Sequence, residues 1–123
     1  DLNAIKTALE DAAAQSDLVI TSGGVSVGQA DFTREALEQL GRLAFWRVAL
    51  RPGRPMACGW LGEKRTPFIG LPGNPVAVMV TFLQFVSPLL DRLCGQPTST
   101  PRRLTAIAND ALKSRLKRTA YNH

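Results

Sequence analysis

The 123-residue chain is 45% hydrophobic and 20% charged, which allows a buried core and excludes a disordered polyelectrolyte. Its length suits one domain, or one domain with a piece of another. The net charge of +5 arises in residues 102–123, because residues 1–101 carry nine Lys/Arg and nine Asp/Glu. A nucleic-acid-binding domain should show its positive surplus within its packed part, so we expect no nucleic-acid partner.

The cysteines and the hydropathy pattern indicate a cytoplasmic protein. Cys58 and Cys94 lie far apart without metal-ligand spacing, so we expect buried thiols rather than a disulfide or a zinc site. That usage fits a reducing compartment. No apolar run reaches transmembrane length and no signal peptide is visible, so we expect no membrane partner. The helical spacing that starts at the first residues predicts a piece cut from a longer chain.

The first elements follow the order helix, strand, loop, helix. Residues 2–14 repeat apolar side chains at helical intervals, and residues 17–21, which contain the apolar run 18–20, are typical of a buried strand. A glycine-rich loop, residues 21–31, comes next. Asp31 can cap the following helix, and Gly41 suits its C-terminal end. This alternation predicts an α/β fold with a mostly parallel sheet.

The middle of the chain predicts short strands joined by turns. Residues 43–50 and 56–60 have strand character, and the stretch Arg-Pro-Gly-Arg-Pro at residues 51–55 separates them. A polar loop over residues 61–67 leads to another short strand, residues 68–71. We expect these pieces to form a hairpin-like addition beside the parallel sheet.

An apolar helix is predicted from residue 75 to residue 93. Asn74 is well suited as its N-cap and Pro75 as its first residue, where the missing N–H costs no hydrogen bond. Its apolar face is broad, so we expect burial on more than one side. Pro88 should kink or break the helix, and Gly95 should end it.

The rest of the chain predicts a linker and a second domain. Residues 96–101 combine prolines with small polar residues, as linkers do, and residues 102–108 alternate weakly like a first strand. We therefore divide the chain into a partial α/β domain (1–95), a linker (96–101) and the incomplete start of a C-terminal β domain (102–123).

Three loops could carry chemistry: residues 21–31, 47–55 and 70–75. Each follows a predicted strand, and ligands of open α/β sheets bind at the carboxyl ends of strands, so the loops could converge on one cleft. Close backbone approach at glycines, arginine side chains and a helix N-terminus together suit a phosphorylated or otherwise anionic ligand. The carboxylate of Asp31 could add a divalent metal that bridges phosphates.

Each of these features also has a purely structural interpretation. The glycine loop could be a plain strand-to-helix turn, because it matches neither the dinucleotide fingerprint nor the P-loop. Asp31 could act only as a helix cap, and Arg51 and Arg54 could be solvated turn residues. No histidine base accompanies the serines of the loop, so nothing marks a nucleophile. The residues alone leave the ligand open.

The three loops resemble those of the molybdopterin molybdenumtransferases, the molybdenum insertases of molybdenum-cofactor biosynthesis. The similar stretches, in the family's order and at its spacing within residues 1–95, are Ser22-Gly23-Gly24-Val25-Ser26-Val27-Gly28 with Asp31-Phe32, Phe45-Trp46-Arg47-Val48-Ala49 with Arg51-Pro52-Gly53-Arg54-Pro55, and Gly70-Leu71-Pro72-Gly73-Asn74-Pro75. The resemblance implies a three-layer α/β/α molybdopterin-binding domain, truncated at its N-terminus. It also implies that adenylylated molybdopterin and molybdate are converted to molybdenum cofactor with release of AMP, aided by Mg²⁺, in a homodimeric enzyme.

The resemblance assigns a role to each matching residue. Catalysis would fall to Asp31, Arg47 and Arg51, with Asp31 also holding the metal. The pterin nucleotide would be bound or its pocket shaped by Ser22, Gly23, Gly24, Ser26, Gly28, Arg54, Pro72, Gly73, Asn74 and Pro75. The family commonly has Lys where this chain has Arg at 47, 51 and 54, which keeps the charge but replaces a point charge by a planar fork.

The resemblance covers only part of such an enzyme, so we expect these residues to keep ligand-binding loops but to be poorly active or inactive alone. Two other classes stay open. One is another enzyme of the same fold, either a molybdopterin adenylyltransferase or a nucleotide hydrolase like the competence-damage proteins. The adenylyltransferases carry a Thr-Gly pair where this chain has Val25-Ser26-Val27. The other class is a non-catalytic scaffold domain, which would bind no anionic ligand.

Overall fold

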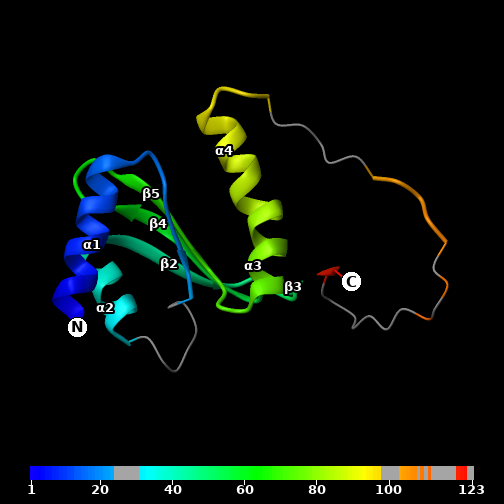
Figure 1. Cartoon of the computed structure of the whole chain (residues 1–123), viewed down its shortest axis with the longest axis horizontal. Coiled ribbons are helices and arrows are strands. Elements are labelled where there is room, and N and C mark those ends of the chain that lie inside the picture. Colours follow the sequence, from blue (N-terminus) through cyan, green and yellow to red (C-terminus); the bar gives the residue numbers. More distant parts are fainter. Residues whose placement is uncertain (24–30, 98–102, 108, 110, 112–118, 122–123) are drawn as a thin grey trace.

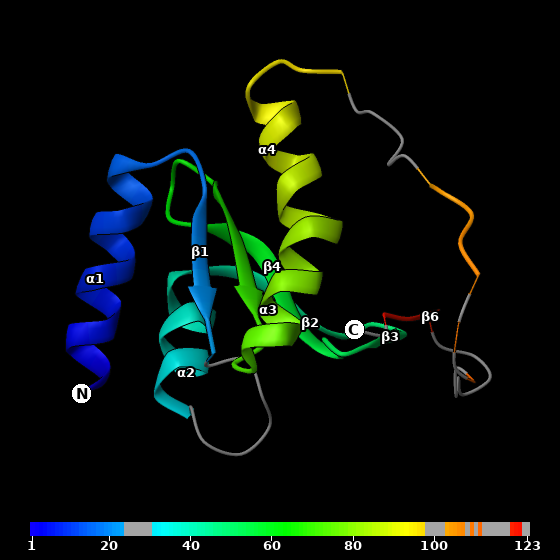
Figure 2. The same cartoon turned by 45° about the vertical axis from the view of Figure 1, so that its right-hand side comes forward.

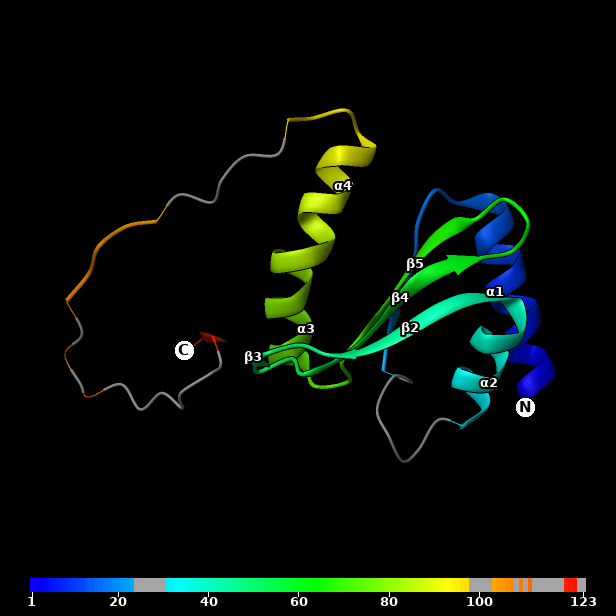
Figure 3. The same cartoon turned by 180° about the vertical axis from the view of Figure 1, so that it is seen from behind.

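A computed structural model describes residues 1–23, 31–97, 103–107, 109, 111 and 119–121 (Figure 1). Its elements are α1 (Leu2–Gln15), β1 (Val19–Ser22), α2 (Asp31–Leu40), β2 (Gly41–Arg47), β3 (Leu50–Arg51), β4 (Pro55–Leu61), β5 (Thr66–Leu71), α3 (Pro75–Thr81), the π-helical turn η1 (Phe82–Val86), α4 (Ser87–Leu93) and β6 (Thr119–Ala120). Helices α1 and α2 cover one face of the sheet, and the continuous helix α3–η1–α4 lies on the other (Figures 1 and 3). The predicted α/β class with three layers is confirmed.

The described sheet is mixed rather than mostly parallel. The predicted hairpin-like addition is confirmed, since β2, β4 and β5 are joined in antiparallel pairs, and it makes up most of this sheet. Its strand order is β1-β5-β4-β2; β1 and β5 run parallel, and β4 is antiparallel to both of its neighbours. The cause is the shortness of the connections. Residues 62–65 join β4 to β5 in a tight turn, and the arginine-rich turn returns β2 toward β4. Connections this short can join only antiparallel strands, since a parallel pair needs a crossover.

Two cores occupy the two faces of the sheet, because side chains alternate along each strand. Ala57 and Phe68 face α1 and α2, whereas Met56 and Ile69 face the long helix. The first core consists of Leu9, Ala13, Val19, Ala36, Leu37, Ala57, Leu61 and Phe68. The second consists of Met56, Ile69, Leu71 and Val86, with partly buried residues of the long helix around them. Both faces of the central strands are therefore covered.

The long helix begins as its sequence predicts. The Asn74 side chain accepts a hydrogen bond from the Ala77 N–H at 3.1 Å, and Pro75 is the first helical residue. The break expected near Pro88 is the π-helical turn just before it, where the Ser87 N–H donates to the Phe82 carbonyl. Pro88 itself lies at the start of α4. Gly95, with φ of +73°, follows the last turn, as C-terminal glycines do.

The predicted burial of this helix on more than one side is wrong. Only one face is buried, through Ala77, Thr81 and Val86. The other face exposes large apolar side chains: Val76, Met79, Leu83, Phe85 and Leu93. At 19 residues and a mean hydropathy of 1.5, the stretch Pro75–Leu93 does reach transmembrane length and composition, contrary to the sequence analysis. Core helices of water-soluble proteins satisfy the same criterion, and this one packs against a sheet.

Smaller corrections concern single residues. Ile20 is 39% exposed although its strand was predicted to be buried, because β1 lies at the edge of the described sheet. Gly41 opens β2 instead of capping α2 in a left-handed conformation; a Cβ at this position would overlap the Trp60 carbonyl oxygen on β4. Residues 103–107 are exposed and without the predicted strand.

The cysteines behave differently from each other. Both are free, as predicted. Cys58 is half-buried beside the second core, and burial raises the pKa of its thiol. Cys94 is exposed near the end of α4, which corrects the expectation that both would be buried.

Candidate functional site

The glycine loop and the Gly70–Pro75 loop meet where β1 and β5 end. These strands are parallel neighbours, with Ser22 opposite Leu71, so both loops leave the same edge of the sheet. The Gly23 N–H donates to the Leu71 carbonyl at 3.0 Å. A Cβ built on Gly73 would lie 3.7 Å from the Gly23 Cα, so the two backbones pass in van der Waals contact. Gly23 has φ of +87°, a conformation that favours glycine.

The start of α3 offers fewer free N–H groups than the sequence suggests. Pro75 has none, the Ala77 N–H is bound by the Asn74 side chain, and the Val78 N–H donates to the Asn74 carbonyl at 2.8 Å. The cap of the helix is thus satisfied by its own residue. Asn74 therefore already has a structural role in the described chain, and a contact with ligand would be additional to it.

The arginine turn, residues 47–55, lies at the same end of the sheet. It connects β2 to β4, and β4 separates β2 from β5. Arg47 ends β2 opposite Pro55, and the Val48 N–H donates to the Arg54 carbonyl at 2.9 Å, which closes the turn. Gly53 is buried with φ of +110°. A Cβ there would lie 2.5 Å from the Thr81 Cγ2, so the turn is packed tightly onto α3.

The three arginines of this turn concentrate positive charge. Arg47, Arg51 and Arg54 are exposed, and among the described residues none of their guanidinium groups has a hydrogen bond, an ion pair or a ring contact. Other arginines do have partners: Arg65 lies over the Trp60 ring, and Arg34 pairs with Glu38 at 2.8 Å. Guanidinium groups without a counter-charge attract carboxylates, phosphates and oxyanions.

The structure thus brings part of the predicted site together. Ser22 and Gly23 lie beside Pro72 and Gly73. The arginine turn extends from β2, which is two strands from β5 and so roughly 10 Å away at the usual strand spacing. Gly24, Ser26 and Gly28 lie outside the described residues. The same is true of the Asp31 side chain, although α2 begins at this residue.

Two features at this end of the sheet were not predicted from the sequence. The Thr21 hydroxyl oxygen is buried and has no hydrogen-bond partner in the described part of the chain. Its position beside Ser22 was the only signal. The second feature is β6, which pairs in parallel with β3 inside the arginine turn. No spacing or composition in the sequence points to this pairing.

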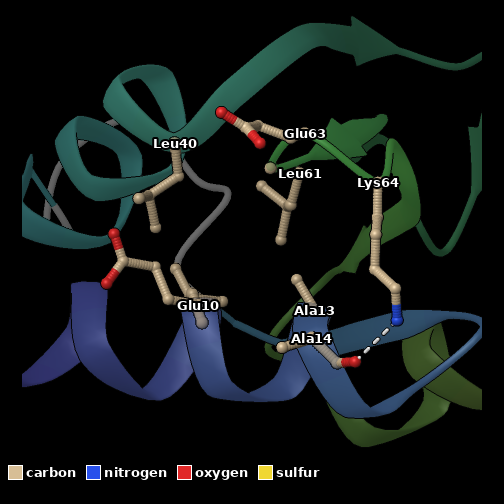
Figure 4. Close-up of a pocket in the computed structure, with 9 residues that line it drawn as sticks. Glu10, Ala13, Ala14, Leu40, Leu61, Glu63 and Lys64 are labelled. Carbon is tan, nitrogen blue, oxygen red and sulfur yellow. Dashed lines mark hydrogen bonds between the residues drawn. The ribbon is translucent and has the colours of Figure 1, made fainter.

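A cavity of about 270 Å³ lies at the opposite end of the sheet, where β4 turns into β5 (Figure 4). Leu9, Ala13, Leu40 and Leu61 give it an apolar lining, with Glu10 and Glu63 at its rim. Its Lys64 ammonium donates to the Ala14 carbonyl at 2.8 Å. Two carboxylates line this cavity and its one ammonium group is already hydrogen-bonded, so it is unsuited to an anionic ligand. The end of the sheet that carries the three loops is the better candidate for such a ligand.

Metal ligands do not gather within the described residues. No group of three His, Cys, Asp or Glu side chains in that part of the chain could hold a metal ion. A metal at Asp31 would therefore need ligands from outside that set, such as the phosphates of a bound nucleotide.

Comparison with known proteins identifies the family. A model described as the probable molybdopterin binding domain matches residues 1–92. The chain belongs to this family. The match includes all three candidate loops and ends within α4, so the loops belong to the region that the family model covers.

Similar proteins carry consistent names. The molybdopterin molybdenumtransferase of Haemophilus influenzae is 51% identical over 111 residues, which is 89% of this chain and 27% of that protein. The enzyme of the same name from Nostoc sp. is 38% identical, over 96% of this chain and 28% of its own length. The crystal structure of the molybdopterin biosynthesis MoeA protein from Pyrococcus horikosii is similar with a TM-score of 0.64 and 35% identity, covering 78% of this chain and 23% of that one. The chain thus spans little more than a quarter of the length of these two enzymes.

Proposed function

We propose that this chain is the pterin-nucleotide-binding part of a molybdopterin molybdenumtransferase. The reaction is the insertion of molybdate into adenylylated molybdopterin with release of AMP, a step of molybdenum-cofactor biosynthesis. The observation that carries the proposal is the contact of two glycine loops, Gly23 against Gly73, at the carboxyl ends of the parallel pair β1–β5. Ligands of α/β sheets bind at such ends, and two relatives bear the name of this activity.

Each part of the site would contribute a different interaction. Because Gly23 and Gly73 have no side chains, a flat pterin or a phosphate can approach the backbone closely there. The guanidinium groups of Arg47, Arg51 and Arg54 would bind the phosphates of the nucleotide and the incoming molybdate, both of which are oxyanions. Negative charge brought by these ligands would relieve the repulsion among the three arginines.

Asp31 is the one residue of this chain that we propose as a ligand of Mg²⁺. The described residues supply no metal-binding cluster, so a Mg²⁺ ion would take ligands from Asp31 and from the substrate's phosphates. If so, Mg²⁺ binding should require the nucleotide. Calorimetric titration of the nucleotide-free chain with Mg²⁺ should give no signal, and the signal should appear once AMP is present.

The complete enzyme extends beyond these residues. We propose a cytoplasmic homodimer whose cleft includes parts of the protein that this chain does not contain, so the chain alone should bind ligand and catalyse poorly. The exposed apolar face of α3–η1–α4 is available to such parts. Gel filtration of the full-length protein would detect the dimer.

Titration with AMP and with molybdate tests the binding function. Arg47→Ala should weaken binding by about tenfold or more, because a hydrogen bond to a charged group contributes about 1.5–3 kcal/mol. Arg42→Ala is the matched control, an exposed arginine at the other end of the same strand. Equal effects of the two substitutions, or no binding by the unaltered chain, would refute the proposal.

The other functions make different predictions. An adenylyltransferase or a nucleotide hydrolase would turn over ATP, and a scaffold domain would bind none of these anions. The names of the relatives do not favour either alternative. Measuring ATP turnover by the full-length protein would separate the first alternative from the proposed transferase.

A further inference from the structure

The end of the chain forms a strand against the arginine turn. Strand β6 pairs in parallel with β3, with Thr119 opposite Leu50 and Ala120 opposite Arg51 (Figure 2). The Thr119 N–H donates to the Ala49 carbonyl at 2.9 Å, and the Tyr121 N–H donates to the Arg51 carbonyl at 2.9 Å. Two segments far apart in the sequence are thus joined at the residue to which the proposed function gives an anion-binding role.

The main chain of the turn is held from different sides. Within the turn, the Val48–Arg54 hydrogen bond closes the loop, and Gly53 packs onto Thr81 of α3. Along β3 the contact comes from β6. A two-residue strand such as β3 has little stability of its own, because short pairs bury little surface and their edge groups bond to water. Removing β6 would leave the Arg51 main chain fixed only by its neighbours in the turn.

We propose that β6 is a positioning element of the anion site: its N–H donors fix the main chain at Arg51 and thereby hold the guanidinium where the ligand binds. This inference rests on the proposed function. An arginine side chain has high rotamer entropy, and binding is weaker when its main chain must also be ordered. Pre-ordering by β6 reduces that cost. The anion affinity of the α/β domain would then depend on a segment outside it in sequence.

Proline substitutions test the inference directly. Tyr121→Pro removes the N–H that bonds to the Arg51 carbonyl, while Ala120→Pro removes the intervening N–H, which in an extended strand points away from β3. Tyr121→Ala removes the ring and keeps the N–H. We expect Tyr121→Pro to weaken AMP binding by about three- to tenfold, since one hydrogen bond contributes about 0.5–1.5 kcal/mol, and the two control variants to bind like the unaltered chain.

A coupling measurement separates positioning from general destabilisation. If β6 acts through Arg51, Tyr121→Pro should have no further effect on AMP affinity in the Arg51→Ala background. In the Arg47→Ala background it should keep its full effect, because Arg47 lies on β2 and not on the strand that pairs with β6. Equal effects in both backgrounds, or equal binding by Tyr121→Pro and Ala120→Pro, would overturn the inference.

Amide hydrogen exchange distinguishes the possible failures. The N–H groups of Thr119 and Tyr121 should be protected in the unaltered chain, and rapid exchange of both would show that β6 does not hold the turn. If these amides are protected but the unaltered chain binds neither AMP nor molybdate, the proposed function fails and the positioning role with it. If the unaltered chain binds AMP but Tyr121→Pro and Ala120→Pro have the same AMP affinity, the positioning role alone is wrong.

Discussion

Replacing Gly53 by alanine should test how the arginine turn is attached to α3. The φ of +110° is a conformation that side-chain-bearing residues rarely adopt, and such strain costs about 1–3 kcal/mol. The added methyl group would also lie 2.5 Å from the Thr81 Cγ2, and overpacking of this kind costs about another 1–3 kcal/mol. We therefore expect Gly53→Ala to lower the free energy of unfolding by about 2–6 kcal/mol.

Urea denaturation followed by circular dichroism would measure this loss, with an unchanged m-value indicating that the folded state is retained. Gly62→Ala is the matched control. Its φ of +64° is also left-handed, but no atom lies within 4 Å of the added Cβ, so only the conformational cost of about 1–2 kcal/mol remains. The difference between the two variants therefore contains the contact with Thr81 together with the larger conformational cost at φ of +110°.

A second substitution checks that Thr81 is the obstacle. Thr81→Ser removes the Cγ2 and keeps the hydroxyl, which donates to the Ala77 carbonyl at 2.7 Å. In the Gly53→Ala background it should recover about 1–3 kcal/mol, the overpacking part of the loss. Equal losses for Gly53→Ala and Gly62→Ala, or no recovery in the double variant, would refute the proposed packing of the turn on α3.

Three further predictions concern the helix cap, the cysteines and the ligand. Asn74→Ala should reduce stability by about 1 kcal/mol through loss of the bond to the Ala77 N–H, whereas Asn74→Asp should keep the cap and weaken AMP binding by added negative charge. At pH 8, Cys94 should react with a thiol reagent much faster than Cys58, because it is exposed and burial raises the pKa of the Cys58 thiol, which lowers its thiolate fraction. AMP at about a hundred times its Kd should stabilise the chain by about 2.7 kcal/mol in thermal unfolding, and this gain should fall in Arg51→Ala.

Each of these has a contradicting result. Unchanged AMP affinity in Asn74→Asp would leave Asn74 with a purely structural role. A single labelling rate for both thiols, or a fast phase that survives Cys94→Ser, would contradict the exposure of Cys94. If saturating AMP leaves the midpoint temperature of thermal unfolding unchanged, the chain does not bind this ligand.

The features predicted from the sequence are those with local causes. The start of α3 follows from Asn74 and Pro75, because an N-cap side chain bonds to an N–H only three residues away. Gly95 ends α4 through its own φ. Neither depends on the remainder of the fold, so both could be predicted from a few neighbouring residues.

The failed predictions depend on contacts between distant segments. Gly41 was predicted to be a helix cap because a glycine after a helix is typical of one, but the structure requires glycine there for close approach to Trp60. The antiparallel direction of β4, by contrast, agrees with the predicted hairpin-like addition, because it follows from short local turns. The pairing of β6 with β3 leaves no trace in composition or period, since two extended residues can pair with any free edge.

One alternative left open by the sequence was that Arg51 and Arg54 are solvated turn residues. Exposure of the two side chains fits this interpretation as well as an anion site, whereas a tightly packed Gly53 at φ of +110° and a strand along β3 are contacts that an anion site would use to order the turn. Here the main chain is held on both sides, while the guanidinium groups have no partner among the described residues. Ordering a backbone costs conformational entropy, and the ordered cations repel one another. A rigid main chain that presents uncompensated guanidinium groups is the arrangement expected of a preorganised anion site, because an oxyanion then binds without further ordering of the turn.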